Sequence, residues 1–151
     1  MKKEREVGKE LQMLSRQIKR RMDQSVSEYQ ITGKQVFILL YIYDESKKRD
    51  VYAKDIEVAF DMRRASVTGI LQLMEKNGII QREGNAQDAR LKKLMLTTKA
   101  KEAREKLKKE IIQVEKVLTK GISDQELVIF FTIMRKMSHN LCLKEKKEEK
   151  Q

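Results

Sequence analysis

The sequence predicts a mainly α-helical protein that carries one small β-hairpin. The 151 residues contain no Pro and only six Gly, and 38% of them are charged, many being Lys and Glu. This composition suits long surface helices better than a sandwich or a barrel. The hairpin is predicted by two short segments, 79–83 and 91–96, that flank the polar stretch 84–89. In the second segment the side chains alternate between an apolar and a polar face, as they do in a strand.

The first helix is expected from residue 5 to about residue 28. Its apolar residues recur at steps of three and four, which places them on one face of an otherwise charged helix. These residues are Val7, Leu11, Leu14, Ile18, Met22 and Val26. A lone helix cannot keep such a stripe in water, so this face must pack against another part of the protein.

The segment that follows opens a compact central unit. Thr32 and Gln35 have the spacing of a capping box, which marks the start of a helix. The run VFILLYIY behind it could also form a buried strand, but the cap favours a helix. The residues expected to face inward are Val36, Leu39, Leu40 and Tyr43. Residues 44–50 are expected to form a polar loop.

Two further helices are predicted in this central unit, over 53–60 and about 63–76, with only Asp61 and Met62 between them. Two short helices joined by a tight turn form a helix-turn-helix. The inner face of the second helix is expected to carry Val67, Ile70, Leu71 and Met74. Gly78 closes it, because Gly adopts the left-handed conformation most easily. The hairpin comes next, with Leu94 and Leu96 on one side and Lys93 and Met95 on the other.

Two long amphipathic helices are expected to complete the chain. Thr98 can cap the first of them, which runs to about Thr119 and carries an apolar stripe formed by Ala100, Ala103, Leu107, Ile111, Val114 and Leu118. Ser123 and Glu126 form a second capping box. The helix that they open carries Leu127, Phe130, Phe131, Met134, Met137 and Leu141. The charged tail 143–151 is expected to fray.

The whole chain, 1–151, is therefore predicted to be one domain with a winged helix-turn-helix at 31–97. Residues 1–29 and 98–142 are interpreted as dimerisation helices. They carry more apolar surface than one winged helix can cover, and most soluble oligomers are two-fold homodimers. A homodimer is therefore expected.

The charge points to a polyanionic partner. The formal net charge is +11 and the isoelectric point is about 9.7. Charge alone does not choose between DNA, RNA and an anionic membrane, and a merely soluble Lys-rich protein explains it equally well. The longest apolar run, 36–43, is far shorter than the roughly 20 residues of a membrane helix. The charged start has no apolar segment behind it, so we do not expect it to be a signal peptide. A cytoplasmic protein with no membrane partner is expected.

Three stretches of this sequence resemble the MarR family of bacterial transcription regulators. They are ITGKQVFILLYI, DIEVAFDMRRASVTGILQLMEKNGIIQR and QDARLKKLMLT, which together span residues 31–97. The resemblance implies a homodimer that binds near-palindromic duplex DNA and usually represses transcription. It also implies that a small-molecule effector can release the DNA by binding between the dimerisation and DNA-binding parts. The sequence departs from the family pattern at Tyr52, Glu57 and Asp61.

The residues expected to contact DNA lie on the second helix of the helix-turn-helix and on the wing. A recognition helix inserts its N-terminal residues and outer face into the major groove. On this helix they are Arg63, Arg64, Ser66, Thr68 and Gln72. Positive charge is disfavoured at a helix N-terminus. This local cost favours a DNA contact for the two arginines, although they could simply be solvated there. Residues 62–93 hold seven basic and three acidic residues, a net charge of +4.

On the wing, the resemblance implies that Arg90 reaches the minor groove, where narrow A·T-rich stretches attract Arg. Asp88 is then expected to bond the hairpin and hold its shape. The other interpretation is an ordinary surface ion pair between these two side chains, worth at most about 1 kcal/mol. Arg82, Lys92 and Lys93 are candidates for phosphate contacts.

An enzyme is the first alternative that the sequence disfavours. It has no glycine-rich phosphate motif and no HExxH, and we expect no catalytic residue, metal or cofactor. Its single His139 and single Cys142 are expected to be structural residues on the last helix, and a single Cys allows no disulfide within the chain. The second alternative is a basic helical module that binds RNA or other proteins without operator specificity. It leaves the wing unexplained, and only 5% of residues are aromatic. No residue identifies an effector.

Overall fold

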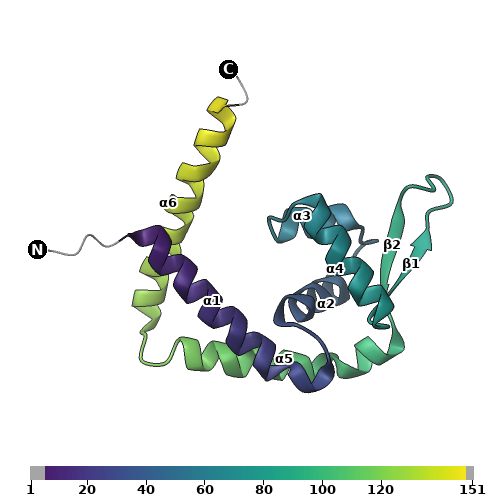
Figure 1. Ribbon diagram of the computed structural model, residues 1–151, viewed down its shortest axis with the longest axis horizontal. Coiled ribbons are helices and arrows are strands. Elements are labelled where there is room, and N and C mark those ends of the chain that lie inside the picture. The colour runs from purple at the N-terminus through teal and green to yellow at the C-terminus, as the bar shows by residue number, and fades with distance from the viewer. Residues whose placement is uncertain (1–5, 149–151) are drawn as a thin grey trace, which may run out of the picture. The chain divides into compact units, whose positions relative to one another are not determined.

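The computed structural model describes residues 6–148, and the chain divides into two compact units, one up to Glu115 and one from Lys116. Its elements, drawn in Figure 1, are α1 (Val7–Ser25), η1 (Ser27–Tyr29), α2 (Gly33–Glu45), α3 (Ala53–Ala59), α4 (Arg64–Lys76), β1 (Ile80–Gly84), β2 (Lys92–Leu96), α5 (Thr98–Leu118) and α6 (Asp124–Glu148). The predicted fold class is confirmed: it is mainly α-helical, with one antiparallel hairpin as the wing. None of the described helices is long and apolar enough to cross a membrane.

The first unit is organised around α2. Its capping box is present, because the Gln35 N–H donates to Thr32 Oγ1 over 3.2 Å and the Thr32 N–H donates to Gln35 Oε1 over 3.1 Å. The buried residues of the helix include Val36, Ile38, Leu39 and Ile42. Leu40 and Tyr43, which were also expected to face inward, are half-buried and pack against this core at its margin. Ile38 and Ile42 are fully buried but were not in the predicted inward set. The helix has neighbours on more than one side, so a single-stripe pattern does not describe it.

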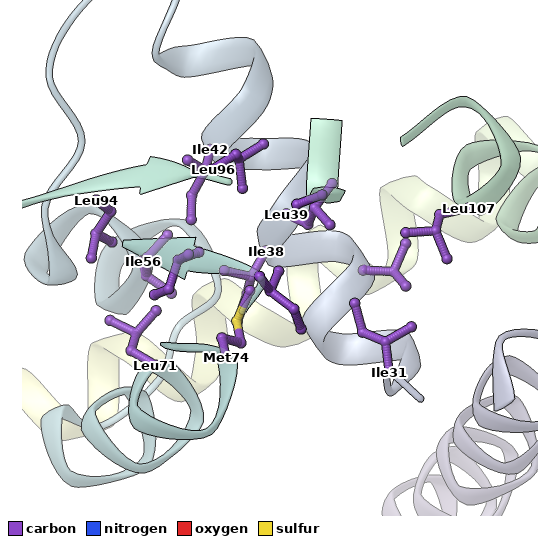
Figure 2. Packing of buried hydrophobic residues seen from close by; sticks show 14 of the residues in the cluster. Ile31, Ile38, Leu39, Ile42, Ile56, Leu71, Met74, Leu94, Leu96 and Leu107 are labelled. Carbon is purple, nitrogen blue, oxygen red and sulfur yellow. The ribbon is translucent and has the colours of Figure 1, made fainter. Parts of the chain in front are cut away.

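The core continues from α2 to the other elements of this unit. Ile56 of α3, Leu71 and Met74 of α4, and Leu94 of β2 all have at most 1% of their surface exposed. Figure 2 shows these side chains on the same side of the cluster as Ile38. Leu107 of α5 and Ile31, which precedes α2, lie at the other end. The predicted inner face of α4 is confirmed, with Ile70 half-buried at its margin.

The hairpin pairs Ile80 with Leu96 and Gly84 with Lys92, so each strand begins one residue later than predicted. In Figure 1 it projects from the edge of the short helices. Leu94 and Leu96 are buried as the alternation predicted. The N–H of Leu94 also donates to the Val51 carbonyl over 2.8 Å, which ties the second strand to the segment before α3.

The turns confirm one backbone prediction and correct another. Gly78 has a φ of 69° and is left-handed as predicted, and Asp61, in the turn between α3 and α4, is left-handed too, with a φ of 47°. The cap of α5, however, is Thr97 and not Thr98. Thr97 Oγ1 accepts the Ala100 N–H over 3.2 Å and donates to the Gly78 carbonyl over 2.6 Å. Thr97 lies one residue closer to the hairpin than Thr98 does, so its hydroxyl can bond both the first turn of α5 and the turn after α4.

The second unit contains the end of α5 and all of α6. The predicted capping box is present, because the Glu126 N–H donates to Ser123 Oγ and the Ser123 N–H donates to a Glu126 carboxylate oxygen over 2.8 Å. Hydrogen bonding from Ser123, chiefly from its backbone N–H, lowers the pKa of the Glu126 carboxyl. The prediction that the tail frays from residue 143 was wrong as far as residue 148, because α6 continues to Glu148. Lys and Glu favour helix, and no Gly or Pro interrupts this stretch.

α1 and α2 approach each other closely at Gly33. The Gly33 N–H donates to Asp23 Oδ1 over 2.9 Å, and Lys19 Nζ lies 2.6 Å from the other oxygen of the same carboxylate. Burial opposes ionisation of Asp23, but these two bonds together lower its pKa. A Cβ added to Gly33 would lie 2.6 Å from the Cβ of Met22, closer than real Cβ contacts come.

We therefore expect Gly33→Ala to lower the free energy of unfolding by about 1–3 kcal/mol, the usual cost of overpacking, because α1 must shift to admit the methyl group. Gly69→Ala is the matched control, since a Cβ on this α4 glycine meets nothing within 4 Å. Removing a helical glycine should raise stability by about 0.5–1 kcal/mol. Urea denaturation measures both changes, and equal stability of the two variants would contradict the close approach.

Candidate nucleic-acid interface

The N-terminus of α4 presents two cations. Arg63 is the N-cap residue, Arg64 is the first residue of the helix, and both side chains are exposed. The turn before them is fixed, because the Met62 N–H donates to the Glu57 carbonyl over 2.9 Å. Unpaired backbone N–H groups and the helix dipole make such an end attractive to anions. An anionic partner would therefore meet both guanidinium groups and the helix end.

The outer face of α4 carries the other three predicted contacts. Ser66, Thr68 and Gln72 are exposed, whereas Val67, Leu71 and Met74 on the opposite face are buried. The Thr68 hydroxyl donates to the carbonyl of Arg64 over 2.9 Å. Its hydrogen is therefore used within the helix, and Thr68 can offer only an acceptor to an outside group.

The loop at the tip of the wing is folded around two acceptor side chains. Asn85 Oδ1 accepts the backbone N–H of Gln87 over 2.8 Å and that of Asp88 over 3.4 Å. Asp88 Oδ1 accepts the N–H of Arg90 over 2.9 Å, so this carboxylate bonds the hairpin backbone. The bond expected from Asp88 to the hairpin is present, and Asn85 adds two more bonds that shape the tip.

The three cations at the base of the wing differ in exposure and in whether a carboxylate lies close to them. Lys93 Nζ lies 2.8 Å from Asp50 Oδ1, and this bond raises the pKa of Lys93. Arg82 is largely buried, with Nε 3.3 Å from Glu75 Oε2 but outside hydrogen-bond geometry. Lys92 is exposed and has no ion pair among the described residues. Of the three predicted phosphate contacts, Lys92 is thus the most available.

A hollow of about 280 Å³ joins the recognition helix to the wing. It is lined by residues of α3, α4 and both strands, including Tyr52, Lys54, Arg64, Arg82, Arg90 and Lys92. Four of these six are among the predicted contacts. Lys54 and Tyr52 were not predicted as DNA contacts. Lys54 could have been found as an exposed cation, and Tyr52 as a departure from the family pattern. Lys54 is paired with Glu57 over 3.2 Å, so its charge is partly neutralised.

One long-range hydrogen bond at this site has no signal in the sequence. Asn85 Nδ2 donates to the hydroxyl of Tyr52 over 3.2 Å, across 33 residues of sequence. A side-chain pair of this kind has no local pattern. It could be found only after the hairpin had been placed beside the segment that precedes α3.

This arrangement has counterparts in known proteins. A family model described as the MarR family matches residues 29–91. The transcription regulator MarR from Oenococcus oeni is 28% identical, with a TM-score of 0.74 over 89% of this chain and 99% of that one. The matched segment covers most of the winged helix-turn-helix, so this part of the chain resembles the MarR family in sequence and in fold. S. aureus MepR in its DNA complex is 26% identical, with a TM-score of 0.84 over 91% of this chain and 99% of that one.

A relative found by sequence is also described as a transcriptional regulator. The HTH-type transcriptional regulator BilQ of Clostridioides difficile is 26% identical over 113 residues, which are 75% of this chain and 74% of the relative. Both BilQ and the Oenococcus oeni protein are described as transcription regulators. His139 and Cys142 are both exposed on α6. Within residues 6–148 no group of three or more His, Cys, Asp or Glu side chains is placed to hold a metal ion.

Proposed function

We propose that this protein is a MarR-type transcription regulator, a homodimeric repressor that binds near-palindromic duplex DNA. The observation that carries the proposal is the hollow shared by Arg64 of the recognition helix and by Arg90 of the wing. One stretch of duplex can then meet the helix in its major groove and the wing in the adjacent minor groove. MepR, one of the similar proteins, has been solved as a DNA complex, which supports the proposal.

The exposed face of α4 has the chemistry for reading bases. Arg can bind guanine through two hydrogen bonds, and Gln can do the same with adenine. We assign these roles to Arg63, Arg64 and Gln72, all exposed. Ser66 and Thr68 are placed to bond a base or a phosphate. Because the Thr68 hydrogen is already donated to Arg64, we expect it to accept from a base amino group and not to donate to a phosphate.

The wing contributes Arg90 to the minor groove, with Asp88 shaping the loop behind it. Lys92 supplies a phosphate contact at the base of the hairpin. Arg82 and Lys93 contribute mainly to the positive potential, since each already has a carboxylate within 3.3 Å. A narrow A·T-rich minor groove has an enhanced negative potential, which favours an inserted Arg.

The dimer is proposed from the apolar faces that the chain leaves uncovered. α6 has no buried residue in its described part, although it carries Phe130, Phe131, Ile133 and Met134, each more than 40% exposed. Val7, Leu11 and Leu14 of α1 are exposed as well. A large apolar face that a helix leaves exposed marks an interaction site. A second copy of the chain is the occupant we propose, because isologous pairing covers the same face on both copies.

An effector site is proposed in a second hollow of the first unit. It has a volume of about 380 Å³, within the range of small-molecule sites, and its lining includes Tyr29, Ile31, Leu39, Ile79, Ala103 and Leu107. Its walls come from the segment before α2, from the turn after α4 and from α5. A ligand seated there would separate α5 from the winged helix. This movement would change the distance between the two recognition helices and release the DNA.

The test of DNA recognition begins with selection of bound sequences from a random duplex library, and we expect an inverted repeat. Affinity should fall about 10³–10⁵-fold between 50 and 200 mM salt if 6–10 phosphates are neutralised.

Arg90→Ala should weaken binding to sites with A·T-rich flanks and leave the dimer folded, because Arg90 is exposed and packs in no core. Fluorescence anisotropy measures the affinities. Unchanged affinity of Arg90→Ala would contradict the wing assignment, and equal binding of RNA would favour the non-specific alternative.

Dimerisation is tested by Phe131→Glu on α6. Phe131 is 49% exposed in the single chain, so the substitution should spare the fold of each copy but place a charge in the proposed interface. Light scattering should then report the monomer mass of 17.8 kDa and not twice that value. Gln125→Glu adds the same charge at an exposed polar position of α6 and should remain dimeric. A Phe131→Glu protein that stays dimeric would count against this interface.

A further inference from the structure

We infer that Tyr52 is a positioning residue for the wing. Through its hydrogen bond to Asn85, its hydroxyl holds Arg90 in the orientation that reads A·T-rich flanks. The inference rests on the proposed DNA-binding function and adds to it the residue pair that sets flank preference. Neither residue was among the predicted DNA contacts.

Asn85 connects the shape of the wing loop to the body of the protein. Its Oδ1 accepts two backbone N–H groups of the loop, those of Gln87 and Asp88. Its Nδ2 donates to Tyr52 Oη over 3.2 Å. One side chain therefore shapes the loop and tethers it. Among the described residues, 85–91 make no second hydrogen bond or ion pair to the helices.

The Tyr52 end of the tether is fixed. The Tyr52 N–H donates to Asp55 Oδ2 over 2.8 Å, and the other oxygen of Asp55 lies 2.8 Å from Arg49 Nη1. The preceding residue, Val51, is completely buried and its carbonyl accepts the N–H of Leu94. The backbone of Tyr52 is thus held by the start of α3 and, through Val51, by β2.

The path from Asn85 to Arg90 is short. The Asn85 N–H donates to the Leu91 carbonyl over 2.9 Å, and the Arg90 N–H is held by Asp88. Arg90 lines the same hollow as Tyr52. If the tether is lost, the loop must be ordered when DNA binds, and this ordering lowers affinity. A neutral hydrogen bond of this kind corresponds to about a 3–10-fold change in affinity.

The experiment compares Tyr52→Phe, Arg90→Ala and the double variant on two duplexes with identical half-sites and either A·T or G·C flanks. Tyr52→Phe should lose about 3–10-fold in affinity for the A·T-flanked duplex and change little on the other. In the Arg90→Ala background it should cause no further loss. Tyr43→Phe is the matched control, because the described structure gives the hydroxyl of this half-buried Tyr no hydrogen bond.

Amide hydrogen exchange in the free protein supplies a readout that does not depend on DNA. The Gln87 and Arg90 amides should exchange faster in Tyr52→Phe than in the wild type, because the loop opens more often. If affinity falls but exchange does not change, the hydroxyl acts by touching DNA itself and the inference is wrong. An equal loss on both duplexes would mean general damage and would also overturn it.

The remaining outcomes separate this inference from the proposed function. If the wild type binds duplex DNA, Arg90→Ala weakens that binding and Tyr52→Phe behaves as the wild type, the inference alone fails. If the wild type binds no duplex, the proposed function fails and the inference falls with it.

Discussion

The structure depends on the burial of α2. Its residues Val36, Ile38 and Ile42 have no exposed surface. The face of α4 that contains Leu71 and the face of β2 that contains Leu94 belong to the same apolar cluster. Because interiors are packed at nearly crystalline density, these elements cannot shift independently. The outer face of α4 and the base of the wing are therefore held at a fixed separation by a core that takes no part in recognition.

Side-chain hydrogen bonds hold the tip of the wing, which the core does not reach. The strands of the hairpin are held by ladder bonds and buried leucines, but the tip beyond Gly84 and Lys92 is exposed. The tip instead takes its shape from the side chains of Asn85 and Asp88. Exposed loops supported in this way cost little ordering entropy when they bind. The wing thus combines a rigid base with a tip whose orientation depends on a few hydrogen bonds.

Much of this fold could be predicted from the sequence because its signals are local. The capping boxes at Thr32 and Ser123 and the left-handed Asp61 and Gly78 each depend on a few neighbouring residues. The inward set of α2 was predicted less well, because a helix with neighbours on several sides has no single stripe. The Lys93–Asp50 and Asn85–Tyr52 contacts depend on how the hairpin docks, which no short segment determines.

In the dimer that we propose, two copies of α4 are held one DNA turn apart. The most direct measurement is affinity as a function of half-site spacing, with two selected half-sites separated by one helical turn and by five additional base pairs. Rigid coupling predicts tight binding only when the half-sites lie about 34–36 Å apart on one face of the duplex. Inserting half a turn should reduce affinity to that of non-specific DNA. Equal affinity at both spacings would contradict the account.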